Sequence, residues 1–130
     1  NVRDKIAAQG LTHVVKICEQ VSNDRIWELY RLADCYINLN THEIFGMAIL
    51  ESMYYENAVI ALRAPGPELI IENGVSGQLC DGEEELVQKA LEADKHTIGA
   101  TAHRHVTKYF LWERCAEQIA KIILEIIGKV

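Results

Sequence analysis

Apolar residues recur along the first two thirds of the chain in two alternating patterns. Short runs rich in β-branched or aromatic residues, bounded by polar or turn-forming residues, predict strands. Apolar positions spaced by three and four residues predict helices between these strands. The predicted strands are 13–18, 35–39, 58–62 and a strand near 78–80. The predicted helices are 2–9, a helix beginning at Ile26 and including Ala33, 45–56 and 67–72.

Strands that alternate with helices are typical of right-handed βαβ crossovers and a parallel sheet. From about residue 83 onward the pattern indicates helices only, at 83–93, 95–109 and 112–127. No repeat or linker divides the chain. The sequence therefore predicts one α/β domain over residues 1–130, a Rossmann-like parallel sheet with flanking helices and a C-terminal helical segment.

Composition narrows the class of protein further. The net charge is −6 and no cluster of Lys and Arg stands out, which argues against nucleic-acid binding. Cys18, Cys35 and Cys80 lie in or beside strand-like runs, so we expect small buried side chains in a reducing compartment such as the cytoplasm. The chain opens without Met, within a helix-like pattern, so we expect a fragment of a larger protein.

Glu51 is the most unusual residue of the chain. It lies in the run 44–55, whose other residues are apolar, aromatic or small, and Glu43 precedes it by eight positions. A buried carboxylate requires a hydrogen-bond partner, such as a ligand hydroxyl. The alternative is a solvated Glu on the one exposed strip of a half-buried helix, and the pattern alone favours neither.

The segment 38–46 joins the predicted strand 35–39 to the predicted helix 45–56. Ligands of open parallel sheets bind at such places, outside the carboxyl ends of strands. Gly46 would let an anion such as a phosphate approach the free N–H groups of the first helical turn, although tight packing alone would explain it equally well.

The spacing of the two glutamates limits the chemistry. The Cα atoms of Glu43 and Glu51 should lie about 12 Å apart, which disfavours a simple glycosidase pair, whose carboxylates lie roughly 5–10 Å apart. Two hydroxyl-rich groups on either side of a phosphate fit better, and a nucleotide sugar has that layout.

A set of short motifs in this order resembles the C-terminal, donor-binding domain of family 4 (group 1) retaining glycosyltransferases with the GT-B fold. The resemblance extends from about Leu11 to Trp112-Glu113. The motifs are Ala33-Asp34, Glu43-x-Phe45-Gly46, Leu50-Glu51-x-Met53, Val59-Ile60-Ala61, Gly66-Pro67-Glu68, Asn73-Gly74 and Gly77.

The resemblance implies a role for each matching residue. Glu43 would be the catalytic residue that contacts the donor sugar near its reacting end, and Glu51 would bind the ribose hydroxyls. The amides of Phe45, Gly46 and Met47 would meet the diphosphate.

Two further residues are candidates for the same site. By the resemblance, Gln20 would lie near the base of the nucleotide. His42, a loop histidine at the carboxyl edge of the sheet, is a candidate contact to the sugar, with a solvated loop residue as the alternative.

The implied reaction is transfer of a sugar from a UDP- or GDP-sugar to a hydroxyl acceptor with retention, without a required metal, in glycan, polysaccharide or glycolipid biosynthesis. A non-catalytic α/β interaction module and a related GT-B epimerase or phosphorylase are the alternatives.

Several departures from the family pattern qualify these expectations. Ile44 replaces a glycine, and Tyr54–Ala58 replaces Ala-Cys-Gly-x-Pro. The family's diphosphate-neutralising Arg and Lys and its N-terminal acceptor domain would lie upstream of this chain, so the fragment alone is expected to be inactive. The acceptor domain is the expected partner, and the longer parent can associate peripherally with a membrane. The pair His103 and His105 is not expected to bind metal, because positions i and i+2 of a helix point apart.

Overall fold

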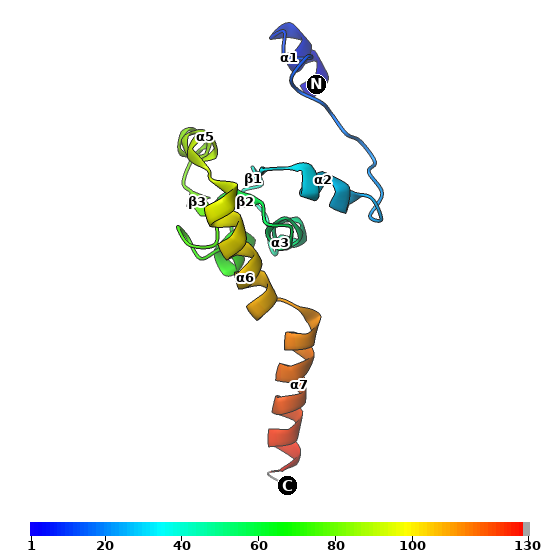
Figure 1. Ribbon diagram of the computed structural model, residues 1–130, viewed down its shortest axis with the longest axis vertical. Coiled ribbons are helices and arrows are strands. Elements are labelled where there is room, and N and C mark those ends of the chain that lie inside the picture. The colour runs from blue at the N-terminus through cyan, green and yellow to red at the C-terminus, as the bar shows by residue number, and fades with distance from the viewer. Residues whose placement is uncertain (129–130) are drawn as a thin grey trace.

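A three-stranded parallel sheet lies at the centre of the molecule. In the computed structural model, which describes residues 1–128, its strands are β1 (Cys35–Asn38), β2 (Ala58–Leu62) and β3 (Gln78–Cys80). They lie side by side in the order β1-β2-β3 (Figure 1). All five residues of the central strand β2 are buried, which explains its uninterrupted apolar sequence.

Helices cover both faces of the sheet. Alternate residues of β2 point to opposite faces, so Val59 joins one apolar cluster and Ile60 the other. The first cluster is covered by α3 (Met47–Tyr54), α4 (Pro65–Ile70) and α6 (Ala100–Tyr109). The second is covered by α5 (Glu83–Glu92). The α/β fold class with a parallel sheet and flanking helices is therefore confirmed.

Two predicted elements differ from the structure. The predicted helix 95–109 begins as a π-helical turn, η1 (Lys95–Gly99), and continues as α6. The predicted strand 13–18 does not form, and Val14 in it is 67% exposed. A β-rich run becomes a strand only when a neighbouring strand offers free backbone groups. Within residues 1–128 no strand pairs with this segment.

The cysteines on the sheet are buried or half-buried, and the cysteine on segment 13–18 is not. Cys80 is buried in the second cluster and Cys35 is half-buried against it, as the sequence predicts. The prediction of a buried Cys18 is wrong, because Cys18 is exposed. Its segment packs against no sheet within the described part of the chain, so no core forms around it.

The two terminal helices lie away from the sheet. Figure 1 shows α1 (Val2–Ala8) at one end of the molecule and α7 (Trp112–Ile127) projecting from the other. No residue of either helix is buried. Among residues 1–128, no helix combines the length and the apolar character needed to cross a bilayer. The remaining helix, α2 (Ile26–Leu32), packs beside α3.

Candidate functional site

Two asparagine side chains shape the loop between β1 and α3. The buried Asn38 accepts a hydrogen bond at Oδ1 from the backbone N–H of Asn40, at 2.8 Å. Asn40 in turn accepts from the backbone N–H of His42 at 3.0 Å and donates its Nδ2 to Glu43 Oε2 at 3.3 Å. Such bonds stabilise turns in which no regular structure pairs the backbone. Asn40 therefore fixes both the turn and the Glu43 carboxylate.

The backbone of this loop packs closely against the start of α4. The Gly66 N–H donates to the Glu43 carbonyl oxygen at 2.8 Å. A Cβ atom on Gly66 would overlap the carbonyl oxygen of Phe45 and lie 2.7 Å from its nitrogen. Only glycine permits this approach. Glu43 is therefore positioned from two sides, by a side-chain amide and by a neighbouring helix.

The amino end of α3 lies directly after this loop. Gly46 precedes the helix in the left-handed region, at φ 98°, and no side chain of residues 1–128 caps the helix. The carbonyl oxygen of Gly46 accepts from the N–H groups of Ile49 and Leu50. The first N–H groups of a helix have no partner within the helix and carry its positive partial charge. This end of α3 is therefore suited to an anion.

Glu51 lies on the next turn of α3, and its side chain is exposed. Of the two alternatives that the sequence left open, the exposed strip of a half-buried helix is thus correct. The carboxylate nevertheless has a protein partner, because the Tyr30 hydroxyl donates to Glu51 Oε2 at 3.0 Å. Tyr30 belongs to α2 and is only 8% exposed.

The negative charges of the site raise the pKa values of two tyrosines, Tyr30 and Tyr36. Burial raises the pKa of Tyr30, and the hydrogen bond to Glu51 raises it further. Burial also raises the pKa of Tyr36 on β1, and the negative charges of Glu43 and Glu51 both add to this shift. Both carboxylates therefore act on the same phenol, and along the chain Glu43 precedes the amino end of α3 and Glu51 follows it.

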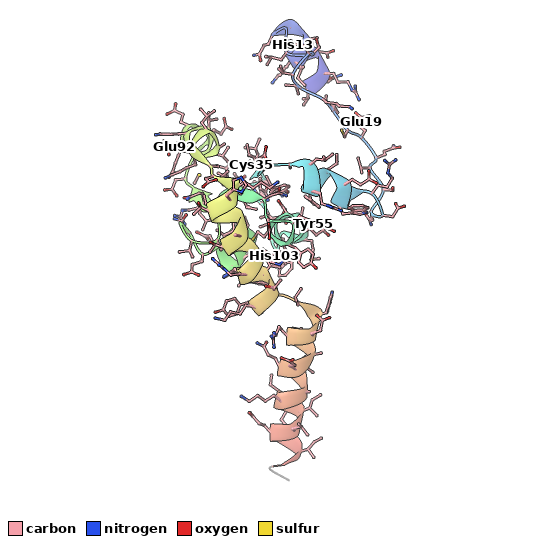
Figure 2. The ribbon with its side chains drawn as sticks, in the orientation of Figure 1. His13, Glu19, Cys35, Tyr55, Glu92 and His103 are labelled. Atoms are coloured by element: carbon pink, nitrogen blue, oxygen red, sulfur yellow. The ribbon has the colours of Figure 1, made fainter. Side chains whose placement is uncertain are left out.

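Gln20 lies in a different place. It lines an open pocket of about 320 Å³ together with Glu19, Arg25 and Glu28, where Arg25 forms an ion pair with Glu28 at 3.0 Å. Figure 2 shows Glu19 on the extended segment that leads into α2. The structure thus brings His42, Glu43, Phe45, Gly46 and Met47 onto one loop and helix end, with Glu51 one turn further. It does not bring Gln20 into contact with them.

Comparison with known proteins supplies the family. The family model for group 1 glycosyl transferases matches residues 1–105. The chain belongs to this family. It is 33% identical over 84 residues to a probable sucrose-phosphate synthase of Thermosipho melanesiensis, covering 63% of this chain and 20% of the relative. It is 28% identical over 134 residues to the D-inositol 3-phosphate glycosyltransferase of Thermobispora bispora, covering 98% of this chain and 31% of the relative.

Solved structures agree with the family. The C-terminal domain of a group 1 glycosyl transferase, LpcC, from Francisella tularensis has a TM-score of 0.71 at 23% identity, covering 85% of this chain and 61% of that one. Anabaena HepE in complex with UDP-glucose has a TM-score of 0.77 at 25% identity, covering 95% of this chain and 36% of that one. The resemblance carried by the sequence motifs is thereby confirmed for the family and the fold. The chain spans about a fifth to a third of the length of the curated relatives it matches.

An apolar pocket of about 360 Å³ lies beside the start of α3. Phe45 and Met47 line it from the start of α3, and Trp112 lines it from α7. No local sequence pattern predicts this pocket, because Trp112 follows Met47 by 65 positions and only the turn between α6 and α7 brings it near.

Tyr30 and Asn40 also belong to this site and are not among the residues predicted from the sequence. The Asn-x-Asn pattern after a strand was an available signal for Asn40, since Asn side chains stabilise turns two residues on. Tyr30 occupies an apolar position of an amphipathic helix. Nothing local in the sequence indicates that its hydroxyl meets Glu51, which is 21 positions away.

The histidine pair on α6 has a structural role. His103, labelled in Figure 2, bonds through Nδ1 to the carbonyl oxygen of Tyr54 at the end of α3. His105 bonds through Nε2 to the carbonyl oxygen of Ile70 at the end of α4, at 2.9 Å. The two rings thus bind carbonyl oxygens at the ends of two different helices, α3 and α4. Among the described residues, no group of three or more His, Cys, Asp or Glu side chains could hold a metal ion.

Proposed function

We propose that this chain is the donor-binding part of a retaining glycosyltransferase, which moves a sugar from a nucleoside diphosphate to a hydroxyl acceptor. One observation carries the proposal. In a group 1 chain, Glu43 and Glu51 flank the uncapped amino end of α3 at the carboxyl edge of a parallel sheet. HepE, whose structure contains UDP-glucose, supports the class of donor.

The charged and polar groups of the site suggest how the nucleotide sugar is placed. The diphosphate lies against the amides of Phe45, Gly46 and Met47, where the helix end favours an anion. Glu51 accepts hydrogen bonds from the ribose, and Glu43 faces the sugar near its anomeric carbon. His42 lies on the sugar side, and Gln20 is the proposed neighbour of the base.

In the proposed reaction the anomeric carbon loses its bond to the diphosphate oxygen and gains one to the acceptor oxygen on the same face. The electron pair of the broken bond leaves with the nucleoside diphosphate, and the acceptor's hydroxyl proton passes to the departing diphosphate oxygen. No metal is required in this proposal. Positive charge for the leaving diphosphate and the acceptor site come from other parts of a longer protein, so this chain alone does not catalyse transfer.

The proposal includes a cellular setting. All four cysteines are free thiols, as expected in a reducing compartment such as the cytoplasm. We propose that the complete protein acts there in glycan or glycolipid biosynthesis.

Calorimetric titration of UDP-glucose and of a GDP-sugar into the 130-residue chain tests this function. We expect saturable binding of one of them, weakened about tenfold or more by Glu51→Ala, because a hydrogen bond to a charged group contributes roughly 1.5–3 kcal/mol. Glu84→Gln, an exposed carboxylate on α5, is the matched control and should bind like the unmodified chain. Absence of binding at millimolar nucleotide sugar would contradict the proposal.

A further inference from the structure

One side-chain bond joins α2 to the proposed donor site. The Tyr30 hydroxyl donates to Glu51 Oε2 at 3.0 Å. The direction of this bond is fixed, because an ionised carboxylate only accepts hydrogen bonds. A phenol has a single O–H donor, and Tyr30 uses it for the hydrogen bond to Glu51.

The phenol that makes this bond is held in place by its neighbours. Its ring stacks on Tyr55, with centroids 6.0 Å apart and planes 14° apart, and tilts against Tyr36 at 6.3 Å. Burial and the nearby Glu51 charge raise the pKa of Tyr30, so the hydroxyl keeps its proton at neutral pH. Tyr30 is therefore a rigid, protonated donor.

Glu51 differs from Tyr30 in its exposure. Its side chain lies at the surface of α3, where a glutamate otherwise samples several rotamers. The bond to Tyr30 occupies one lone pair of Oε2. Within residues 1–128, no other side-chain hydrogen bond or ion pair to Glu51 is formed, so Oε1 can accept from a ligand.

We propose that Tyr30 is a positioning residue that orients the Glu51 carboxylate toward the vicinal hydroxyls of the donor ribose. This inference rests on the proposed function. With Oε2 tied to Tyr30, the carboxylate is already turned for two hydroxyl donors before the nucleotide arrives, which lowers the entropy cost of binding.

A purely structural bond between α2 and α3 makes a different prediction. Such a bond would change the stability of the chain and would affect every nucleotide equally. A positioning role affects only ligands that carry ribose hydroxyls. The two explanations are therefore separated by comparing UDP with 2′,3′-dideoxy-UDP.

The experiment measures dissociation constants of both nucleotides for the unmodified 130-residue chain, Tyr30→Phe and Tyr55→Phe. Tyr55→Phe is the matched control. It removes a hydroxyl from the same aromatic cluster, and the Tyr55 hydroxyl makes no hydrogen bond to Glu51. We expect Tyr30→Phe to weaken UDP binding about five- to tenfold and to leave dideoxy-UDP binding unchanged. Tyr55→Phe should change neither.

A second measurement tests the route through Glu51. In a Glu51→Ala background the chain should no longer distinguish UDP from dideoxy-UDP, and adding Tyr30→Phe should then change neither affinity. Circular dichroism of each variant establishes that it is folded.

Four results would overturn the inference, and the last of them would also contradict the proposed function. Equal weakening of both nucleotides by Tyr30→Phe would assign Tyr30 a structural role. No weakening of either would remove Tyr30 from binding altogether. Equal binding of UDP and dideoxy-UDP by the unmodified chain would show that the ribose hydroxyls are not recognised, while leaving donor binding intact. Failure of the unmodified chain to bind UDP at all would instead contradict the proposed function itself and this inference with it.

Discussion

Glu43 and Glu51 lie on either side of the amino end of α3, and the chain positions them by different means. Glu43 is half-buried on a loop whose residues are mostly exposed, and it accepts hydrogen bonds at its carboxylate from the Asn40 amide and at its carbonyl oxygen from the Gly66 N–H. Glu51 stands on a regular helix with its side chain exposed, bonded to the buried phenol of Tyr30.

This difference shows what each position depends on. The location of a helical residue follows from the helix, so only the orientation of the Glu51 carboxylate depends on a distant partner. The location of a loop residue follows from individual turn bonds and close contacts. Changes around Glu43 should therefore alter chemistry and stability strongly, whereas changes around Glu51 should mainly alter ligand binding.

The largest effect is expected for Glu43→Gln in an active protein that contains this chain. In the proposed function this charge faces the reacting carbon, so its removal should lower the transfer rate on the order of 10³-fold, with little change in the donor dissociation constant. Glu51→Ala should mainly raise that constant. Steady-state kinetics and donor titrations measure both quantities. If the two variants change donor affinity equally, the division of roles is wrong.

Gly66→Ala should give the next largest effect, on stability. Its Cβ atom would overlap the Phe45 carbonyl, so the loop and α4 must separate at a cost of about 3 kcal/mol in the free energy of unfolding. Urea denaturation measures this cost. Gly82→Ala is the control, because its Cβ would meet open space, and it should cost less than about 1 kcal/mol. Similar losses for both variants would mean that the close contact is not important.

Asn40→Ala removes two hydrogen bonds of the loop and should cost about 1–2 kcal/mol in the free energy of unfolding. Asn40→Asp separates the two bonds, because it keeps the acceptor for the His42 N–H and replaces the donor to Glu43 by a second carboxylate. It should retain most of the stability while lowering transfer activity in the complete protein. Asn23→Ala, an exposed asparagine, is the control for stability. Equal activity of Asn40→Asp and the unmodified protein would exclude Asn40 from positioning Glu43.

The smallest effect concerns the alkaline limit of stability. The folded chain keeps the Tyr30 proton to higher pH than the unfolded chain does, because burial and Glu51 raise the Tyr30 pKa. Unfolding therefore releases a proton once the pH exceeds the ordinary phenol pKa of about 10. The stabilisation is complete below that pH and is lost as the pH rises toward the raised pKa of the folded state.

Tyr30→Phe isolates this contribution. In urea denaturation at increasing pH, the unmodified chain should lose up to about 1.4 kcal/mol more per pH unit than Tyr30→Phe above about pH 10. Parallel curves for the two proteins would mean that Tyr30 ionises normally. No comparable test of pH dependence exists for the side-chain partner of Glu43, because the Asn40 amide does not titrate.

The sequence was sufficient for most of the sheet and for the loop of the site. The apolar run 58–62 can only be a strand buried on both faces, and β2 is one. The glycine before the apolar run of α3 marks a helix start at the end of a strand, so the positions of Glu43 and Gly46 followed from local pattern. These features depend on residues adjacent in the chain, which act whatever the remainder of the molecule does.

The segment 13–18 shows where local pattern fails. Its residues favour a strand, but a strand forms only against another strand, and none pairs with it within residues 1–128. Cys18 is exposed for the same reason. The strand propensity of segment 13–18 therefore determined neither its conformation nor the exposure of Cys18.

By itself the sequence determined that this chain is a parallel α/β domain with two glutamates on either side of a helix start. The tertiary structure alone decided that Glu51 is exposed, that Tyr30 bonds it and that Gly66 supports Glu43. The physical reason is that these contacts join residues 21 to 23 positions apart. Their existence depends on how α2, α3 and α4 pack around the sheet, which no local pattern specifies.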